Sequence, residues 1–181
     1  MVENILSTSK LLILLINMPY TIEQKIWSVL RFVMGFIFLW AFLDKLFGLG
    51  FATVAEKSWL AGVSPTAGFL QFGTSGAGAS FFKQLSGSVV VDWLFMLGLV
   101  FVGTALILGV AMRLAGYVGA LMMVLMYTAL SLPPKNNPLF DEHIVYALVL
   151  IGLGASSAGE WYGLGKWWKE LELVKKWKWL E

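Results

Sequence analysis

The chain has 181 residues, of which 59% are hydrophobic and only 13% are charged, and its mean hydropathy is +0.78. A soluble domain usually has about 25% charged residues, and a fold of this size has too little interior to bury so much apolar surface. Disorder requires low hydrophobicity and high net charge, which is the opposite composition. The sequence therefore predicts an integral membrane protein with one domain, residues 1–181.

The charge balance and the cysteine count exclude several functions. There are 13 basic and 11 acidic residues, so the net charge is only +2 and nucleic-acid binding is not expected. With no cysteine and one histidine, the chain cannot form a disulfide, a thiolate metal site or an iron–sulfur centre, and no haem is predicted. A redox role would therefore depend on a bound organic cofactor or on the substrates themselves.

Residues 1–24 precede the first long apolar stretch. They contain the run LLILLI, residues 11–16, which is too short to span a membrane and resembles the core of a signal peptide. No clear small-residue cleavage site follows it, because Asn17, Pro19 and Glu23 come next. We expect residues 1–24 to be a retained segment that lies at the membrane interface.

Charged residues delimit four apolar stretches, each near the roughly 20 residues that a membrane-spanning helix needs. The predicted spans are residues 27–47, 92–113, 113–135 and the shorter 143–159. We therefore predict an all-α fold in which residues 25–160 form a four-helix membrane bundle. Pairs of small residues four apart would let helices approach closely, although ordinary glycine and alanine use explains them equally well. These pairs are Ala115 and Gly119, Gly152 and Ser156, and Gly154 and Ala158.

Two further segments lie outside the predicted spans. Residues 45–91 form a long apolar outer loop with expected helical pieces at 51–61 and 81–85, and we interpret this loop as a lid over the outer mouth of the bundle. Residues 161–181 are rich in tryptophan and lysine, which is typical of an interfacial helix. This tail would anchor the protein at the lipid headgroups, with docking of a partner as the alternative.

Lysine and arginine counts predict the orientation, because cytoplasmic loops carry the excess of positive residues. Four spans place both termini on one side, and that side is the more basic. It carries Lys10, Lys25, Arg113, Lys166, Lys169, Lys175, Lys176 and Lys178, whereas the other side carries Lys45, Lys57, Lys83 and Lys135. We therefore expect a multi-pass protein of a prokaryotic plasma membrane with cytoplasmic termini.

Arg31 is a charged residue inside the first predicted span. It precedes Asp44 by about 20 Å along a helix axis, so those two side chains cannot pair. Either its guanidinium extends to the headgroups, which is the interpretation we favour, or it pairs with Glu160.

Polar residues gather at the predicted outer ends of the spans, where ionisable groups at membrane depth usually have a function. The first span ends with Trp40, Asp44 and Lys45, and the second begins with Asp92 and Trp93. The connection between the last two spans contains the other candidates, which are Lys135, Asn136, Asn137, Asp141, Glu142 and His143. Helix ends are commonly polar, but the whole cluster, with the only histidine of the chain, favours a site.

An apolar cavity lined by tryptophan suits a quinone ring, and quinone reduction needs a proton donor such as a carboxylate or a histidine. We assign catalytic roles to Asp44, Asp141, Glu142 and His143. Binding of substrate or quinone falls to Trp40, Lys45, Asp92, Trp93, Lys135, Asn136 and Asn137. No metal site is predicted, because three adjacent residues cannot all face one ion from a regular helix.

Several short motifs, taken together and in this order, resemble the DoxX/DoxD family of small four-helix membrane proteins. The resemblance covers roughly residues 25–168 and is specific as a combination. The motifs are RFVMGFIFLW (31–40), DKLFGLG (44–50), WLAG (59–62), SPT (64–66), VDWLFM (91–96), PPKNNP (133–138), DEH (141–143) and GLGKW (163–167).

DoxD-like proteins are associated with thiosulfate:quinone oxidoreductase, which joins two thiosulfates into tetrathionate and passes the electrons to a membrane quinone. The resemblance therefore implies an oxidoreductase subunit that acts with membrane quinone and with a second subunit similar to DoxA. It supplies no catalytic residues, so the assignments above rest on charge and position. One alternative is a non-catalytic subunit that anchors or assembles a respiratory complex. A transporter or channel is disfavoured, because broken helices and repeats are lacking.

Overall fold

The computed structural model describes residues 20–130, 134 and 138–181. Within these ranges every regular element is a helix, in agreement with the predicted all-α fold. The run LLILLI and the residues Lys135, Asn136 and Asn137 lie outside the described ranges, so what is predicted for them stays a prediction.

Three helices are long and apolar enough to cross a membrane. They are α2 (Ile22–Phe47), α4 (Val89–Leu108) and α5 (Met112–Leu130). Less than half of the apolar stretch of each helix is buried inside the molecule, namely 28%, 44% and 28%. Such large exposed apolar faces are stable in hydrocarbon, so the three helices fit a membrane-embedded protein.

The fourth predicted span is a shorter helix. α6 covers Glu142–Ala155, and its 14 residues extend only about 21 Å, whereas the hydrocarbon core of a bilayer is about 30 Å thick. The prediction of a full span over 143–159 is therefore not confirmed. The helix ends at Ala155 because the following serines and glycine favour a turn, and Ser156 takes an extended conformation.

Local sequence signals fix the ends of the long helices. α2 begins with a capping box, in which the Thr21 hydroxyl accepts from the Gln24 N–H and the Gln24 side chain accepts from the Thr21 N–H. α2 and α4 end at Gly48 and Gly109, which both adopt the left-handed conformation that favours glycine. Gly109 opens the turn into α5, so the second and third helices meet there and not at Arg113.

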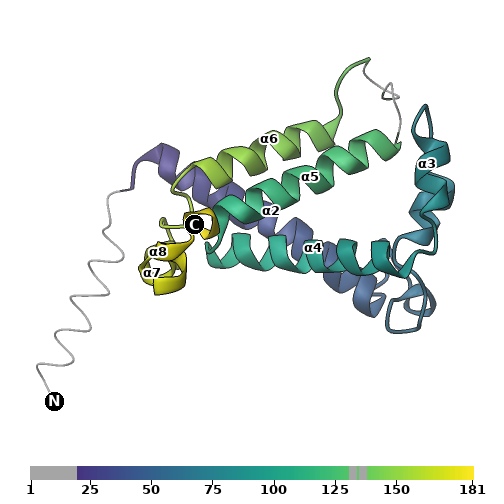
Figure 1. The fold of residues 1–181 in the computed structure, drawn as a ribbon, viewed down its shortest axis with the longest axis horizontal. Coiled ribbons are helices and arrows are strands. Elements are labelled where there is room, and N and C mark those ends of the chain that lie inside the picture. Colours follow the sequence, from purple (N-terminus) through teal and green to yellow (C-terminus); the bar gives the residue numbers. More distant parts are fainter. Residues whose placement is uncertain (1–19, 131–133, 135–137) are drawn as a thin grey trace, which may run out of the picture.

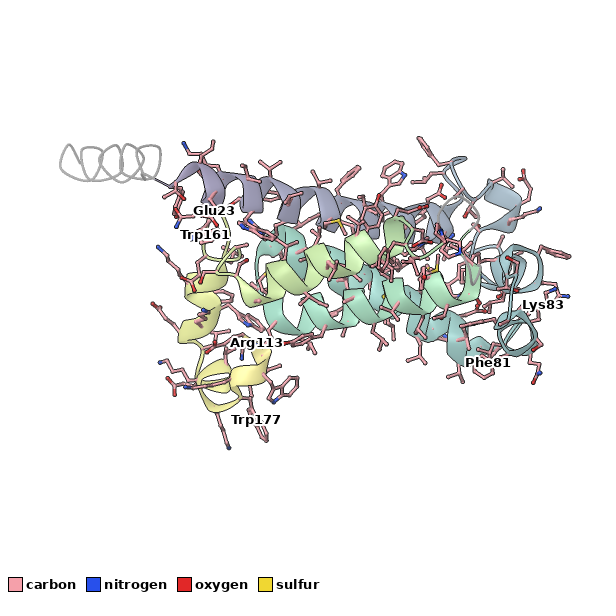
Figure 2. All side chains as sticks on the ribbon, turned by 90° about the horizontal axis from the view of Figure 1, so that it is seen from above. Glu23, Phe81, Lys83, Arg113, Trp161 and Trp177 are labelled. Carbon is pink, nitrogen blue, oxygen red and sulfur yellow. The ribbon has the colours of Figure 1, made fainter. Side chains whose placement is uncertain are left out.

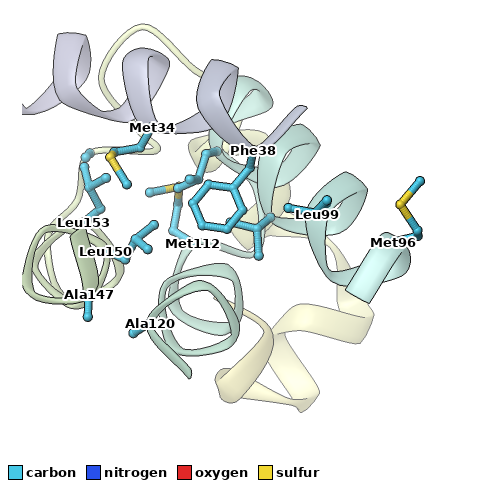
Figure 3. Packing of buried hydrophobic residues seen from close by; sticks show 12 residues of the cluster. Met34, Phe38, Met96, Leu99, Met112, Ala120, Ala147, Leu150 and Leu153 are labelled. Atoms are coloured by element: carbon cyan, nitrogen blue, oxygen red, sulfur yellow. The ribbon is translucent and has the colours of Figure 1, made fainter. Parts of the chain in front are cut away.

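The four main helices associate chiefly as two pairs, α2 with α4 and α5 with α6. Glycines let the backbones touch: a Cβ on Gly103 would lie 2.6 Å from the Leu39 nitrogen in α2, and one on Gly116 would lie 2.6 Å from the Leu150 oxygen in α6. The pairs lie close together near the C-terminal end of the chain and diverge toward α3 (Figure 1). Side chains of all four helices meet in one core (Figure 3).

The helices run between two ends of different structure, which Figure 2 shows at opposite sides of the molecule. The tail end carries the start of α2, the α4–α5 turn and residues 156–181. Its elements are α7 (Gly165–Glu170), α8 (Glu172–Lys176) and the 3-10 helix η3 (Lys178–Leu180). The tail therefore consists of three short helices, where the sequence predicted a single one.

The cap end carries residues 48–88, which we call the cap segment. Its elements are the 3-10 helix η1 (Ala55–Lys57), the π-helix η2 (Phe69–Gly73) and α3 (Ala79–Gln84). The helical piece expected at 51–61 is only a 3-10 turn, and the piece expected at 81–85 belongs to α3. Ser75 attaches the cap segment to the end of α5, because its N–H donates to the Ala129 carbonyl at 3.2 Å.

Candidate functional site

The described candidate residues all lie toward the cap end, as the alternating helix directions predict. They form two groups instead of one cluster, because the end of α2 and the start of α4 lie on one side of this end and the start of α6 on the other (Figure 1). No hydrogen bond or ion pair among the described residues joins the groups. The first group is Trp40, Asp44, Lys45, Asp92 and Trp93, and the second is Asp141, Glu142 and His143.

Asp44 holds the beginning of the cap segment against α2. Its side chain is almost fully buried, with 2% exposure. Oδ1 accepts from the Phe51 N–H at 3.2 Å, and Oδ2 accepts from the Ala52 N–H at 3.0 Å. Gly48 and Gly50, both at positive φ, turn the chain back so that these N–H groups face the carboxylate. Two N–H donors thus stabilise the buried charge.

Asp92 holds the middle of the cap segment in a similar way. It is 5% exposed, and its Oδ1 accepts from the Ser64 hydroxyl at 2.8 Å and from the Thr66 hydroxyl. Ser64 in turn accepts from the Ala67 N–H at 3.0 Å, which fixes the local turn. Since Asp92 lies in the first turn of α4, the positive end of the helix dipole also favours its charge.

The carboxylates of Asp44 and Asp92 therefore have a structural role, because they hold the cap segment. This agrees with the alternative that these residues belong to the ordinary polarity of helix ends. Lys45 contributes to the same junction through its backbone, because its carbonyl accepts from the Trp59 N–H at 2.9 Å. The catalytic role of Asp44 and the binding roles of Asp92 and Lys45 stay predictions.

Aromatic side chains surround this first group. Trp40 stacks on Phe36 with ring centres 5.7 Å apart and meets Phe51 edge-on at 5.1 Å. Trp93 is exposed and meets Trp59 edge-on at 4.7 Å. These contacts place amphipathic rings toward the ends of helices that are long and apolar enough to cross a membrane, and such rings favour the headgroup region.

The second group contains a carboxylate–imidazole pair. Asp141 is the N-cap of α6, and its Oδ1 accepts from the His143 N–H at 3.0 Å. Its Oδ2 lies 3.0 Å from Nδ1 of the His143 ring. The side chains are 18% and 13% exposed, so the pair is largely shielded from water.

The pair fixes the state of the imidazole. An ionised carboxylate can only accept hydrogen bonds, so Nδ1 of His143 carries a proton and donates the hydrogen bond to Asp141. In the neutral ring, Nε2 is then left with a lone pair and can take up a proton from a bound molecule or return one. Asp141 and His143 therefore have the geometry of an oriented general acid–base.

Glu142 is exposed in the first turn of α6 and extends the group. Ligand atoms of Asp141, Glu142 and His143 lie within 4.8 Å of one another, and no other described residues form such a potential metal-binding group. The expectation that the three could not face one point is therefore wrong. It assumed a regular helix, whereas Asp141 precedes the helix with an extended backbone. Both oxygens of Asp141 are already engaged by His143, so we assign no metal.

Arg31, at the tail end, differs from both expectations for it. Its side chain is 0% exposed, so the guanidinium does not reach the headgroups. It donates instead to the carbonyl oxygens of Leu106, of Ile107 at 2.8 Å and of Tyr162 at 3.0 Å. The first two carbonyls belong to the last turn of α4, where the negative end of the helix dipole favours a cation.

Glu160 does not pair with Arg31, because Lys169 of α7 binds it at 2.6 Å. Ser64 and Thr66, the hydroxyl partners of Asp92, were not among the predicted site residues. Two hydroxyls separated by one residue in an apolar segment are a weak signal, but together with a buried aspartate they could have indicated the contact.

Comparisons with family models, with curated proteins and with solved structures find no match for this chain. Fold and site therefore rest on the residues of the chain itself. The resemblance to the DoxX/DoxD family stays an inference from the motifs quoted above.

Proposed function

We propose that this protein is a membrane subunit of a quinone-linked oxidoreductase, similar to DoxD-like proteins, with thiosulfate as the electron donor. The observation that carries the proposal is the shielded pair of Asp141 and His143 at 3.0 Å. It lies at the end of a helix that packs along α5, one of the helices long enough to cross a bilayer. A membrane quinone approaching from the lipid would find an oriented proton donor and acceptor there.

The proposal includes a four-helix membrane bundle in a prokaryotic plasma membrane, with the tail end in the cytoplasm. α6 supports the bundle, because Val145, Leu148 and Ile151 present an exposed apolar face. A short helix of this kind is accommodated by local thinning of the bilayer or by flanking interfacial residues. The basic tail supports the cytoplasmic side.

The chemistry needs both protons and electrons. Two thiosulfates lose one electron each as a sulfur–sulfur bond forms, which gives tetrathionate, and the quinone takes up both electrons and two protons to give the quinol. His143 supplies protons at Nε2, and Asp141 stabilises the imidazolium that forms when the ring is reprotonated. The chain has no cysteine that could hold a sulfur intermediate, so we assign the sulfur chemistry to a site shared with a second, DoxA-like subunit.

The test is thiosulfate-dependent reduction of a soluble quinone analogue by the purified protein in detergent, alone and with its co-purified partner. His143→Gln removes both ring nitrogens and should lower the rate about 100-fold or more, within the usual contribution of general acid–base catalysis. Asp141→Asn retains an N-cap but loses the charge, and it should lower the rate by a similar factor. Unchanged turnover in both variants would contradict the proposal.

The matched control is Lys175→Gln in α8. Lys175 forms an exposed ion pair with Glu172 in α8, and α8 lies at the opposite end of the molecule from the start of α6, where His143 lies (Figure 1). This variant changes one charge without touching the pair and should retain the rate of the wild-type protein.

A second candidate function is a non-catalytic subunit that assembles a respiratory complex. The observation in its favour is the apolar surface of the cap segment, where Phe72 is 86% exposed and Phe51, Leu60 and Phe81 are also exposed. Such side chains suit a contact with larger redox subunits. Co-purification with those subunits in mild detergent, lost in a Phe72→Ser variant, would favour assembly. A stable, isolated homo-oligomer would count against it.

A further inference from the structure

A pocket of about 160 Å³, lined by both charged and apolar side chains, lies at the tail end. Its walls come from the α4–α5 turn, from the end of α6 and the residues that lead into α7, from α7 itself, and from Glu181. Figure 2 shows Arg113 beside the tail segment that carries Trp177. The volume is below the roughly 300 Å³ of a drug-sized ligand site, so the pocket suits a small polar group.

The pocket contains charges of both signs. Arg113 and Lys169 line it together with Glu160 and Glu181. Lys169 binds Glu160 at 2.6 Å, whereas Arg113 lies 3.9 Å from Glu181, which is a loose contact for an ion pair. All four side chains are partly exposed, with 26% to 47% of their surface accessible, so they can turn toward a ligand.

Arg113 has unused hydrogen-bonding capacity. A guanidinium offers five N–H donors in a planar fork that matches phosphate oxygens. Within the described residues, its side chain makes one hydrogen bond, to the Lys178 carbonyl at 3.3 Å, besides the contact with Glu181. Ser156 and Ser157 add hydroxyl groups to the same wall.

The pocket also has the right depth in a bilayer. It adjoins the turn between α4 and α5, two helices that can cross a membrane, so it lies where the hydrocarbon ends. Trp168 of α7 lines the pocket, and Trp167, Trp177 and Trp179 are exposed elsewhere on the tail; tryptophan favours the headgroup region.

We infer that this pocket binds the head group of a phospholipid that carries both a phosphate and a primary ammonium group, as in phosphatidylethanolamine. Arg113 and Lys169 bind the phosphate, and the carboxylates of Glu160 and Glu181 accept hydrogen bonds from the ammonium group. A balanced set of two cations and two anions complements such a zwitterion better than it complements an anionic lipid. The site is independent of the quinone chemistry at the cap end.

The test uses the full chain in detergent, titrated with short-chain phosphatidylethanolamine, phosphatidylcholine and phosphatidylglycerol, with bound lipid measured by native mass spectrometry. The quaternary ammonium of phosphatidylcholine cannot donate a hydrogen bond, so phosphatidylethanolamine should bind about tenfold more tightly. Soluble phosphoethanolamine should displace the bound lipid, and inorganic phosphate at the same concentration should not.

Two variants separate the halves of the pocket. Lys169→Gln should weaken the binding of both zwitterionic lipids by about tenfold, because both bind through their phosphate. Glu160→Gln should abolish the preference for phosphatidylethanolamine over phosphatidylcholine. Lys175→Gln, outside the pocket, should bind like the wild type. Equal binding of the two zwitterionic lipids by the wild-type protein would overturn the inference, and so would tighter binding of phosphatidylglycerol.

Discussion

The two ends of the molecule bury charges of opposite sign, and among the described residues Arg31, Asp44 and Asp92 form no ion pair. At the tail end, the cation of Arg31 is surrounded by carbonyl oxygens. At the cap end, the anions of Asp44 and Asp92 are surrounded by N–H and hydroxyl groups. Dipoles of the backbone and of hydroxyl groups thus stabilise these three buried charges, so their stability depends on the geometry of the hydrogen bonds.

The helix dipole explains part of this difference. Asp92 lies at the start of α4, where the helix dipole is positive, and Arg31 lies beside its end, where the dipole is negative. The dipole of α4 therefore stabilises both charges. Asp44 lies in the last turn of α2, where the dipole disfavours a carboxylate. Its stability therefore depends on the cap segment folding back to supply two N–H groups.

The glycines differ between the ends as well. At the tail end, a Cβ on Gly109 would lie 2.7 Å from the Gly159 oxygen, and one on Gly159 would lie 2.4 Å from the Gly109 oxygen. At the cap end, a Cβ on Gly50, Gly62 or Gly87 would meet no other atom within 4 Å. Gly109 and Gly159 thus pack closely against each other, whereas these three glycines of the cap segment have open space; Gly48, where the cap segment begins, is packed, because a Cβ there would lie 2.5 Å from the Ala55 Cα.

The largest effect is expected from Arg31→Met. The substitution leaves several buried carbonyl groups without a donor and should lower the free energy of unfolding by about 3–5 kcal/mol. Arg31→Lys keeps the charge but loses the planar fork, so its cost should fall between the wild type and Arg31→Met. Unfolding in mixed detergent micelles, followed by circular dichroism, gives the three values.

A buried charge can also be nearly neutral in net free energy, because its removal abolishes a desolvation cost. If Arg31→Met stays within about 1 kcal/mol of the wild type, the carbonyl contacts of Arg31 do not stabilise the tail end. Lys175→Ala is the control for a basic residue on the surface, and it should change stability by less than about 0.5 kcal/mol.

Two glycines with similar positive φ test the difference in packing. Gly109 at the tail end and Gly87 at the cap end have φ values of 75° and 80°. Alanine at Gly87 has only the strain of a positive φ, and it should lower the free energy of unfolding by about 1 kcal/mol. Alanine at Gly109 also meets backbone atoms, so it should cost about 3 kcal/mol or more. Equal thermal unfolding shifts in the two variants would mean that the tail end can relax as easily as the cap end.

Replacement by asparagine should lower stability by different amounts at Asp44 and Asp92, the two buried aspartates of the cap end. In Asp92→Asn the remaining oxygen can still accept from both hydroxyls, because both use Oδ1, and the cost should be about 1 kcal/mol. In Asp44→Asn the new amide group faces one of the two backbone N–H donors, so the cost should be about 2–3 kcal/mol.

Limited proteolysis within residues 48–88 compares these two variants. The cap segment should open more often when its hydrogen bonds to Asp44 or Asp92 are weakened. Asp44→Asn should be cleaved faster than Asp92→Asn, and the wild-type protein slowest. The reverse order of the two variants would show that the Asp44 carboxylate does not need both oxygens.

The long helices were predictable because hydropathy and glycine signals are local. The first span was expected over 27–47 and runs from Ile22, and the second and third are each shifted by a few residues. α6 is shorter than expected, because the apolar run continues past Ala155 into residues that favour a turn. Apolar character alone does not mark that end.

The partners of the buried charges were not predictable. Arg31 and Asp44 bind backbone groups, which every residue possesses, so the sequence holds no signal for which carbonyl or N–H is used. Asp141 and His143 were predicted as members of one polar cluster from their charge and their position at a helix end, and not from the N-cap geometry that joins them. The separation of these two residues from Asp44 and Asp92 follows from the divergence of the helix pairs, which only the tertiary packing determines.

The smallest effect is expected at the start of α6, where one carboxylate serves both the helix and the histidine. Asp141→Ala removes the N-cap and should lower the free energy of unfolding by about 1 kcal/mol, whereas Asp141→Asn should cost only a few tenths, about 0.3 kcal/mol. Both variants lose the acceptor charge at Nδ1 of His143. If Asp141→Ala and Asp141→Asn lower the rate of quinone reduction equally but differ in stability, the carboxylate acts on the imidazole and not through the helix. A loss of activity that follows stability would assign Asp141 to capping alone.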